Sequence, residues 1–371
     1  MMNTSFMNIT LTFIAKKYSN QNHKIMPQGP NNKTIIAKTP PLMLAWFAAH
    51  KRPLLWREAR TPYKVWLAEV MLQQTTVTTA TGYFTRFLAR FPTLESLAAA
   101  PLDDILHMWQ GLGYYSRARN LHNCARTVVD GYGGDFPATA PELEKLPGIG
   151  PYTAAAVACI AFDEPTPVVD GNIERVISRL FAIKTPLPKS KPEIKKYAAT
   201  LTPQKQSGDY AEAMMDLGAT ICTPRGPKCG ACPLEALCKA RHMGIQEILP
   251  KKEKKKPSPE KTGTVYAFFA PDGTLYIQKR GEKGLLAGLW ELPHKNWEPD
   301  HMPDFSKEID LHKTETVGQI RHVFTHFRLT LNIEKITLEN KPKSSGEWVK
   351  AEQVKDYALP TLMKKITDLL T

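Results

Sequence analysis

Four of the six cysteines lie close together and could hold a metal. The spacing Cys-x6-Cys-x2-Cys-x5-Cys joins Cys222, Cys229, Cys232 and Cys238. Four thiolates are the ligand set of structural zinc and of [4Fe–4S] clusters, and the spacing alone does not distinguish the two. Six cysteines in 371 residues are too few for a disulfide framework, and Cys124 and Cys159 stand alone in apolar stretches. The pattern therefore predicts one metal site in a reducing cytoplasm.

Two carboxylates have neighbours that would set their pKa values apart. Glu69 is the single acid in the largely apolar segment 63–74. It either faces solvent or is buried with a raised pKa, which would let it donate a proton at pH 7. Asp170 precedes a helical pattern, so it either caps that helix or, held by backbone N–H groups, keeps a low pKa and faces a developing cation. Together the two would form a pair that cleaves glycosidic bonds.

A glycine-rich segment could bind a phosphate. It reads Leu146-Pro147-Gly148-Ile149-Gly150-Pro151-Tyr152-Thr153-Ala154 and lies between two helical patterns. Gly148 and Gly150 let the backbone turn sharply and present N–H groups at the start of the next helix, where a phosphate is favoured. The segment predicts a helix-hairpin-helix that binds DNA independently of sequence, although a plain turn between helices would also suit an isolated Gly-x-Gly.

Helical patterns position these groups between residues 42 and 245. Thr61 before Pro62 marks a helix start, and further helices are expected over residues 65–74, 102–109, 118–129, 141–146, 152–162, 173–181 and 210–222. Residues 251–259 are rich in Lys and Pro and read as a linker. The period then changes to two, with strands expected over 264–269, 275–279, 319–324 and 328–333, a turn at Asp272-Gly273, and a final helix over 360–370.

Length and charge bound the class of protein. The chain suits two or three soluble domains, with a disordered extension at 1–38, a helical domain at 39–245 that includes the cysteine loop 222–238, a linker at 246–262, and an α+β domain at 263–371. The first 57 residues carry no acid, as in a transit peptide, although an upstream start codon explains this equally well. No run approaches the ~20 apolar residues that span a bilayer. A net charge of +13 favours a polyanion such as nucleic acid.

From residue 40 onward the chain resembles the adenine DNA glycosylase (MutY) family of the endonuclease III superfamily. The resemblance rests on Trp56-Arg57, residues 65–74, the segment 111–121 (GLGYYSRARNL), the hairpin, Val169-Asp170-Gly171-Asn172 and the cysteine spacing. It implies an all-α helix-hairpin-helix core, a [4Fe–4S] cluster on the four cysteines, and duplex DNA as partner. The implied reaction is removal of adenine mispaired with 8-oxoguanine or guanine, by base flipping and hydrolysis of the N-glycosidic bond.

The resemblance also implies roles for individual residues. Glu69 protonates adenine N7, Asp170 stabilises the oxocarbenium-like sugar, and Tyr152 and Asn172 support the two carboxylates. The adenine pocket matches Trp56, Arg57, Leu72 and Glu212. The positions that contact or wedge into DNA are Gln74, Leu112, Tyr114, Gly148 and Gly150.

The C-terminal third resembles the MutT/Nudix-like domain of the same family, through residues 284–293 and 321–326. Its metal-binding Arg-Glu-x-x-Glu-Glu helix is missing, so pyrophosphate hydrolysis lacks its Mg²⁺ carboxylates. Phe324-Thr325-His326 aligns with the Phe-Ser-His loop that reads 8-oxoguanine, with Thr325 keeping the hydroxyl of the usual serine.

Two departures from related enzymes favour a monofunctional hydrolase. Tyr152 stands where glycosylase/lyases carry a Schiff-base lysine, and Glu174 stands where some adenine glycosylases have a lysine. The alternatives are an endonuclease III-like glycosylase/lyase and a non-catalytic iron–sulfur DNA-binding protein. A cytoplasmic, nucleoid-associated monomer is expected, without membrane contact and with the linker as a docking site for repair or replication proteins.

Overall fold

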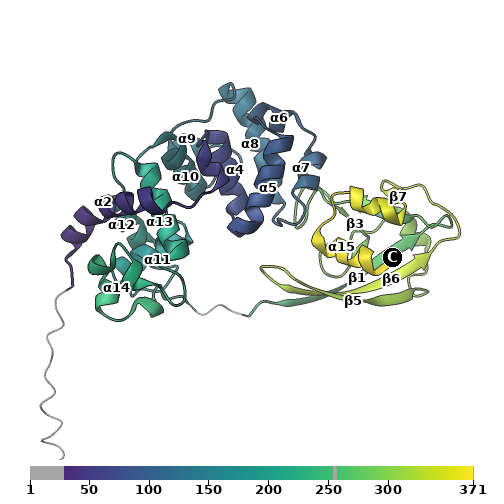
Figure 1. Cartoon of the computed structure of the whole chain (residues 1–371). Coiled ribbons are helices and arrows are strands. Elements are labelled where there is room, and N and C mark those ends of the chain that lie inside the picture. Colours follow the sequence, from purple (N-terminus) through teal and green to yellow (C-terminus); the bar gives the residue numbers. More distant parts are fainter. Residues whose placement is uncertain (1–28, 254–256, 371) are drawn as a thin grey trace, which may run out of the picture.

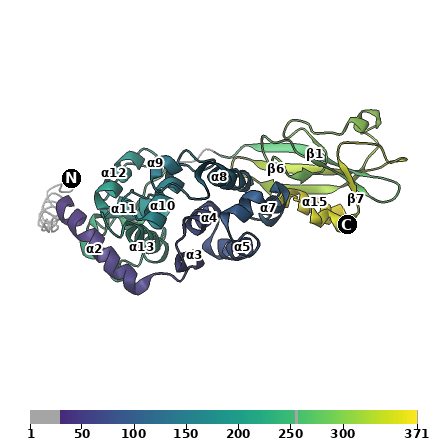
Figure 2. The same cartoon turned by 90° about the horizontal axis from the view of Figure 1, so that it is seen from above.

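A computed structural model describes residues 29–253 and 257–370 of the chain. A helical domain and a sheet domain lie end to end in an elongated molecule (Figure 1 and Figure 2). Within the described residues, no helix is both long enough and apolar enough to cross a membrane. The expected class, a helical core followed by an α+β domain, is confirmed.

The helical domain contains most of the helices that the sequence predicts and several that it does not. Its helices are α2 Asn32–His50, α3 Leu55–Glu58, α4 Pro62–Leu72, α5 Val77–Arg90, α6 Leu94–Ala99, α7 Leu102–Met108, α8 Ser116–Tyr132, α9 Ala140–Leu143, α10 Pro151–Phe162, α11 Gly171–Leu180, α12 Lys191–Leu201, α13 Ser207–Thr220 and α14 Lys239–His242. Helix α4 begins where the sequence predicts a helix start. Thr61 is its N-cap, and the Thr61 side chain accepts a hydrogen bond from Lys64 N at 3.3 Å.

The start of the helical domain differs from the expectation. Helix α2 begins at Asn32, because Asn31 accepts a hydrogen bond from Thr34 N at 2.9 Å and so caps the first turn. The predicted extension 1–38 is therefore too long at its C-terminal end, and residues 1–28 lie outside the described part. Ile35, Met43 and Phe47 bury the inner face of α2 against the core.

The C-terminal domain is a mixed seven-stranded sheet with one long helix. The main strand order is β3-β2-β1-β6-β5, with β4 pairing to β1 and β7 to β2. The bounds are β1 Glu260–Phe269, β2 Leu275–Lys279, β3 Trp290–Glu291, β4 His294–Lys295, β5 Glu315–Val323, β6 Arg328–Thr337, β7 Glu347–Val349 and α15 Thr361–Leu370. β1 and β6 run parallel over ten residue pairs, from Glu260↔Arg328 to Phe269↔Thr337.

The connection between the domains is shorter than the predicted linker 246–262. Leu187 N donates to Lys251 O at 2.8 Å and Arg179 Nε donates to Leu249 O at 3.0 Å, so residues 249–251 belong to the helical domain. On the other side β1 already begins at Glu260. The charge of the Lys-rich run did not prevent its first residues from pairing through their backbone.

The two domains contact each other through apolar and polar groups. Leu289 and Ala358 of the C-terminal domain belong to the hydrophobic core of the helical domain. Gln110, in the loop between α7 and α8, donates from Nε2 to Tyr357 O at 2.8 Å and accepts from Lys364 Nζ. This contact fixes the face of the C-terminal domain that meets the loop 109–115.

Candidate active site

Glu69 is a buried acid with a raised pKa. Helix α4 is buried all round from Val65 to Met71, which places the Glu69 carboxyl inside the protein with 7% of the residue exposed. Burial is the main cause that raises the Glu69 pKa, to about 7. The Tyr152 hydroxyl opposes the rise by donating to Glu69 Oε2 at 2.7 Å, whereas the negative charges of Asp170 and Glu212 add to it. Glu69 can therefore carry a proton near neutral pH.

Asp170 both caps helix α11 and faces the same site. Its Oδ1 accepts from Asn172 N at 3.0 Å and Ile173 N at 2.7 Å, and its Oδ2 accepts from Asn172 Nδ2 at 2.7 Å. The expectation of a low pKa is wrong, because burial raises the pKa of Asp170 more than these hydrogen bonds lower it. Burial is the main cause that raises the pKa of Tyr152 well above its usual value, and the negative charges of Glu69 and Asp170 raise it further.

A network of charges joins two of the residues that are expected to line the adenine pocket, Arg57 and Glu212. Arg57 Nε lies 3.1 Å from Glu212 Oε1, and Arg57 Nη1 lies 2.7 Å from Asp216 Oδ2. Besides burial, the negative charge of Glu212 raises the pKa of Glu69, and the positive charge of Arg57 lowers it. Trp56 is buried edge-on against Phe84 with ring centroids 5.5 Å apart. The structure thus brings Arg57 and Glu212 together. Leu72, the last residue of α4, is partly buried.

The sequence reasoning missed Asp216. Its carboxylate is fully buried and pairs with Arg52 as well as Arg57, with Arg52 Nε 2.6 Å from Asp216 Oδ1. Asp216 follows Glu212 by four residues on α13, so the two acids share one helix face. That spacing of two acids on one helix was the available signal, since the arginines that pair with Asp216 lie 164 and 159 positions away in the sequence.

The hairpin residues have the backbone that phosphate binding needs. Gly148 has φ +73°, and a Cβ there would lie 2.4 Å from Asn120 Cβ, so no other residue fits. Gly150 is the N-cap of α10 and leaves the first N–H groups of that helix without a side-chain cap. Both glycines are exposed.

The expected wedge residues differ in accessibility. Gln74 and Tyr114 are exposed and lie in left-handed backbone at φ 59° and 49°. Leu112 is buried, with 6% of the residue exposed, so its side chain does not form part of the DNA surface in this conformation. Its place in the tight turn between two positive-φ glycines, Gly111 and Gly113, directs it into the core.

The four cysteines converge beside α11 and α14. Cys222, Cys229, Cys232 and Cys238 line one small cavity of about 30 Å³, together with Arg179 and Arg241. Arg179 Nη1 donates to Cys222 Sγ at 3.2 Å, and Arg175 connects the loop to the catalytic side, since its Nε donates to Cys222 O at 2.7 Å and its Nη2 to Asn172 Oδ1 at 2.8 Å. Four soft donors around one enclosed space, with cations nearby, fit a negatively charged metal–thiolate group.

The loop between β5 and β6 contacts Tyr114, one of the two expected wedge residues. Thr325 Oγ1 contacts the Tyr114 hydroxyl across the domain boundary, and Thr325 and His326 are exposed. The Phe324 ring is held from behind by Phe327, at 4.7 Å between centroids, and by Trp297, at 6.2 Å. The loop Phe324-Thr325-His326 therefore lies beside Tyr114.

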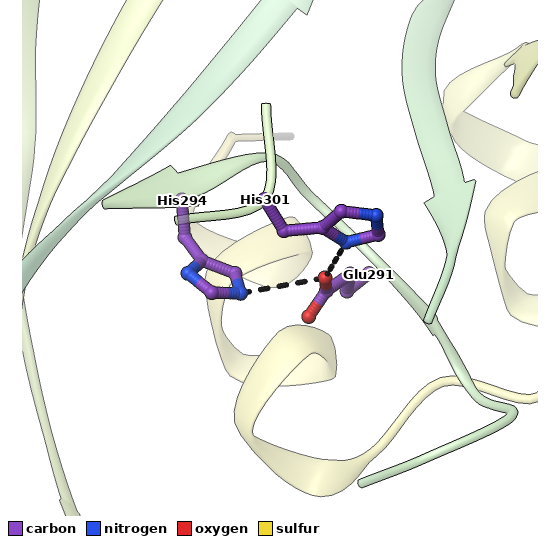
Figure 3. Close-up of side chains that lie close together, drawn as sticks. All are labelled: Glu291, His294 and His301. Atoms are coloured by element: carbon purple, nitrogen blue, oxygen red, sulfur yellow. Dashed lines mark hydrogen bonds and ion pairs between the residues drawn. The ribbon is translucent and has the colours of Figure 1, made fainter. Parts of the chain in front are cut away.

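A buried ion-pair network supports this loop. Glu291 Oε1 accepts from His301 Nδ1 at 2.6 Å and lies 3.4 Å from His294 Nε2 (Figure 3). Such a trio could hold a metal, but Arg280 Nη1 contacts Glu291 Oε2 and lies 2.9 Å from His294 Nε2. The Arg280 guanidinium thus occupies the place that a metal cation would take. The His294 ring packs on the Trp297 ring with centroids 4.9 Å apart. The network therefore supports Trp297, which in turn stacks on Phe324.

Comparisons with known proteins agree with this geometry. The family model of HhH-GPD superfamily base excision DNA repair proteins matches residues 67–204, and that of the NUDIX domain matches residues 264–369. A thermostable thymine-DNA glycosylase superposes on 57% of this chain and 98% of its own, with a TM-score of 0.52 and 30% identity. Endonuclease III in a non-covalent DNA complex covers 58% of this chain and all of its own, with a TM-score of 0.50 and 27% identity.

Adenine DNA glycosylases match over most of the chain. The human enzyme is 34% identical over 395 residues, which cover 87% of this chain and 72% of its own. The enzyme of Buchnera aphidicola subsp. Schizaphis graminum is 34% identical over 338 residues, which cover 88% of this chain and 97% of its own.

The helix-hairpin-helix core and its carboxylate pair define a base-excision DNA glycosylase. The similarity to adenine DNA glycosylases extends through both domains, and this narrows the class to one family. The chain belongs to the adenine DNA glycosylase family. The alternative of a non-catalytic DNA-binding protein is thereby excluded.

Proposed function

We propose that this enzyme removes adenine from pairs with 8-oxoguanine or guanine in duplex DNA, with preference for 8-oxoguanine. The observation that carries the proposal is the contact between Thr325 and Tyr114, which joins the C-terminal reading loop to the wedge of the catalytic domain. A base opposite the flipped adenine would meet the exposed Thr325 and His326 from one side and Tyr114 from the other.

The geometry supports acid-catalysed hydrolysis. Glu69, protonated because its pKa is about 7, gives its proton to adenine N7, and the N9–C1′ bond breaks with its electron pair moving to the base. The Asp170 carboxylate stabilises the positive charge at C1′, and a water adds there and gives its proton to the Glu69 carboxylate, which restores the acid. Tyr152 holds Glu69 and Asn172 holds Asp170 through the hydrogen bonds at 2.7 Å.

The experiment is a strand-cleavage assay on a duplex with adenine opposite 8-oxoguanine. We expect adenine release without strand cleavage until alkali is added, because neither Tyr152 nor Glu174 offers an amine. Borohydride should trap no covalent adduct. Cleavage without alkali together with efficient trapping would favour the lyase alternative, and no adenine release would refute the proposal.

The four cysteines are proposed to hold a [4Fe–4S] cluster. The small cavity that the four cysteines line and the two arginines beside it support this assignment. The cluster fixes the loop 222–238, whose Arg225 and Lys228 form a basic, exposed surface for phosphates. About four irons per chain and loss of the visible absorbance in Cys229→Ser are the expected results; stoichiometric zinc would contradict them.

We further propose a cytoplasmic, nucleoid-associated monomer, in accord with the net charge of +13. The Lys-rich segment around residues 251–259 is proposed to dock other repair or replication proteins. Light scattering of the purified protein tests the monomer directly.

A further inference from the structure

Arg117 on α8 is a buried cation without an acidic partner. Only 8% of the residue is exposed, and burial lowers the pKa of its guanidinium to about 10. Among the described residues no carboxylate forms an ion pair with it. Burying an uncompensated charge is costly unless its donors are satisfied by other groups. The acceptors of the Arg117 hydrogen bonds therefore show which parts of the fold this side chain holds together.

Four carbonyl oxygens accept hydrogen bonds from the two terminal nitrogens of the Arg117 guanidinium, whereas its buried Nε has no partner in the part of the chain that the structure describes. Nη1 donates to Val70 O at 2.7 Å and Met71 O at 3.1 Å, and both lie in the last turn of α4 directly after Glu69. Carbonyls in a last helical turn lack partners within the helix and carry its partial negative charge, which favours a cation. Arg117 thus completes the C-terminus of the helix that carries the acid.

The other two carbonyls belong to the wedge loop 109–115. Nη2 donates to Leu112 O at 3.0 Å and to Gly113 O at 3.1 Å. The guanidinium also lies 5.7 Å from the centre of the Tyr114 ring. A loop with three positive φ angles, at Gly111, Gly113 and Tyr114, needs such support to keep one conformation.

These contacts form one continuous path between the domains. It runs from Thr325 through the Tyr114 hydroxyl and the Gly113 carbonyl to Arg117, and from there to Val70, the residue next to Glu69. The planar guanidinium is suited to this bridge because it holds four acceptors in fixed directions, which an ammonium group cannot do.

We propose that Arg117 is a positioning residue that couples recognition of the opposite base at Thr325 to the placement of Glu69. The coupling rests on the proposed function of the Phe324-Thr325-His326 loop. When the loop engages 8-oxoguanine and shifts Tyr114, Arg117 transmits the shift to the last turn of α4. Arg117 itself touches neither base nor sugar.

A double-mutant cycle in the full-length, cluster-containing protein tests the coupling. Arg117→Lys keeps the charge but loses the bridge, and Thr325→Val keeps the shape but loses the hydroxyl. Single-turnover excision of adenine opposite 8-oxoguanine should fall about tenfold in each variant, and the double variant should be no slower than either alone. Excision opposite guanine should change by less than about threefold.

A second readout separates positioning from loss of structure. The pH at which the Arg117→Lys rate falls to half should move by about half a unit or more, because the surroundings of Glu69 change. Arg126→Lys, the same substitution on the exposed side of α8, should leave both rates and the pH midpoint unchanged.

Three results are decisive. Equal slowing of both duplexes by Arg117→Lys, or multiplying effects of the two substitutions, would overturn the coupling, as would an unchanged pH midpoint. A wild-type enzyme without preference between the two opposite bases would instead refute the proposed specificity. The cycle on the 8-oxoguanine duplex would then still show whether Arg117 and Thr325 act together.

Discussion

At the scale of single residues, the protonation of Glu69 should govern the pH dependence of the reaction. Its pKa is raised to about 7, so the protonated, active form decreases as pH rises through 7. We expect the single-turnover rate to fall about tenfold per pH unit above this value. Measuring the excision rate between pH 6 and 9 checks the prediction. A rate that stays constant to pH 9 would exclude Glu69 as the proton donor.

The same raised pKa predicts an effect on stability. An ionised carboxylate at a site that disfavours charge destabilises the folded state wherever pH exceeds the unfolded pKa of ~4.3, and most above pH 7. Glu69→Gln removes that charge while keeping the shape. At pH 8 its free energy of unfolding should therefore be about 1–3 kcal/mol higher than that of the wild type. Near pH 4 the difference should become small, since Glu69 is then protonated in the folded state and mostly protonated in the unfolded state. Urea denaturation at the two pH values measures it.

Glu69→Gln should still bind the mismatched duplex while excision is lost. Removing a positioned acid typically slows a reaction ~10²–10⁴-fold. A filter-binding assay beside the excision assay separates the two effects. An excision rate within tenfold of the wild type would be incompatible with the assigned role.

At the scale of elements, Gly148 determines whether the hairpin can meet a phosphate. Gly148→Ala would strain a φ of +73° and push a Cβ against Asn120, so α8 and the hairpin must separate. We expect duplex affinity to fall about tenfold or more, and the dependence of binding on salt to become shallower as phosphate contacts are lost. Gly131→Ala, which meets no atom within 4 Å and has an ordinary φ, is the matched control.

Local patterns predicted the elements around the site well, but not the edges of the domains. Thr61-Pro62 and Asp170 cap α4 and α11 as expected, because side-chain capping acts within a few residues. Helix α5 was missed since its Thr-rich sequence has low helical propensity, although Ala80, Phe84 and Phe87 repeat at helical spacing. Tertiary contacts, which overrode propensity there, are not visible in a local window.

The sequence predicted which types of residue form the site, but not the contacts between them. The surroundings of Glu69 indicated a raised pKa, but the direction for Asp170 was wrong because burial depends on the whole fold. The bridge at Arg117 joins residues 47 positions apart, from Val70 to α8, and nothing in the spacing of either segment shows it. Polar groups that satisfy one another at long range emerge only from packing.

At the scale of the whole molecule, two contact regions hold the C-terminal domain, with the loop Phe324-Thr325-His326 that we propose reads the opposite base, against the catalytic domain. One is the docking of Leu289 and Ala358 onto the helical core, together with the hydrogen bonds of Gln110. The other is the contact of Thr325 with Tyr114. Because the proposed catalytic residues lie in the first domain and the proposed reading loop in the second, we expect the choice of opposite base to be separable from catalysis.

The affinity of the enzyme for duplexes with a non-cleavable adenine analogue opposite 8-oxoguanine or guanine tests the central claim most directly. The wild type should prefer 8-oxoguanine, and Phe324→Ala with His326→Ala should reduce that preference about tenfold to a hundredfold, since one recognised polar group contributes ~1–3 kcal/mol. Affinity for the guanine duplex should change much less. An equal loss on both duplexes would contradict the account and reduce the C-terminal domain to a non-specific clamp.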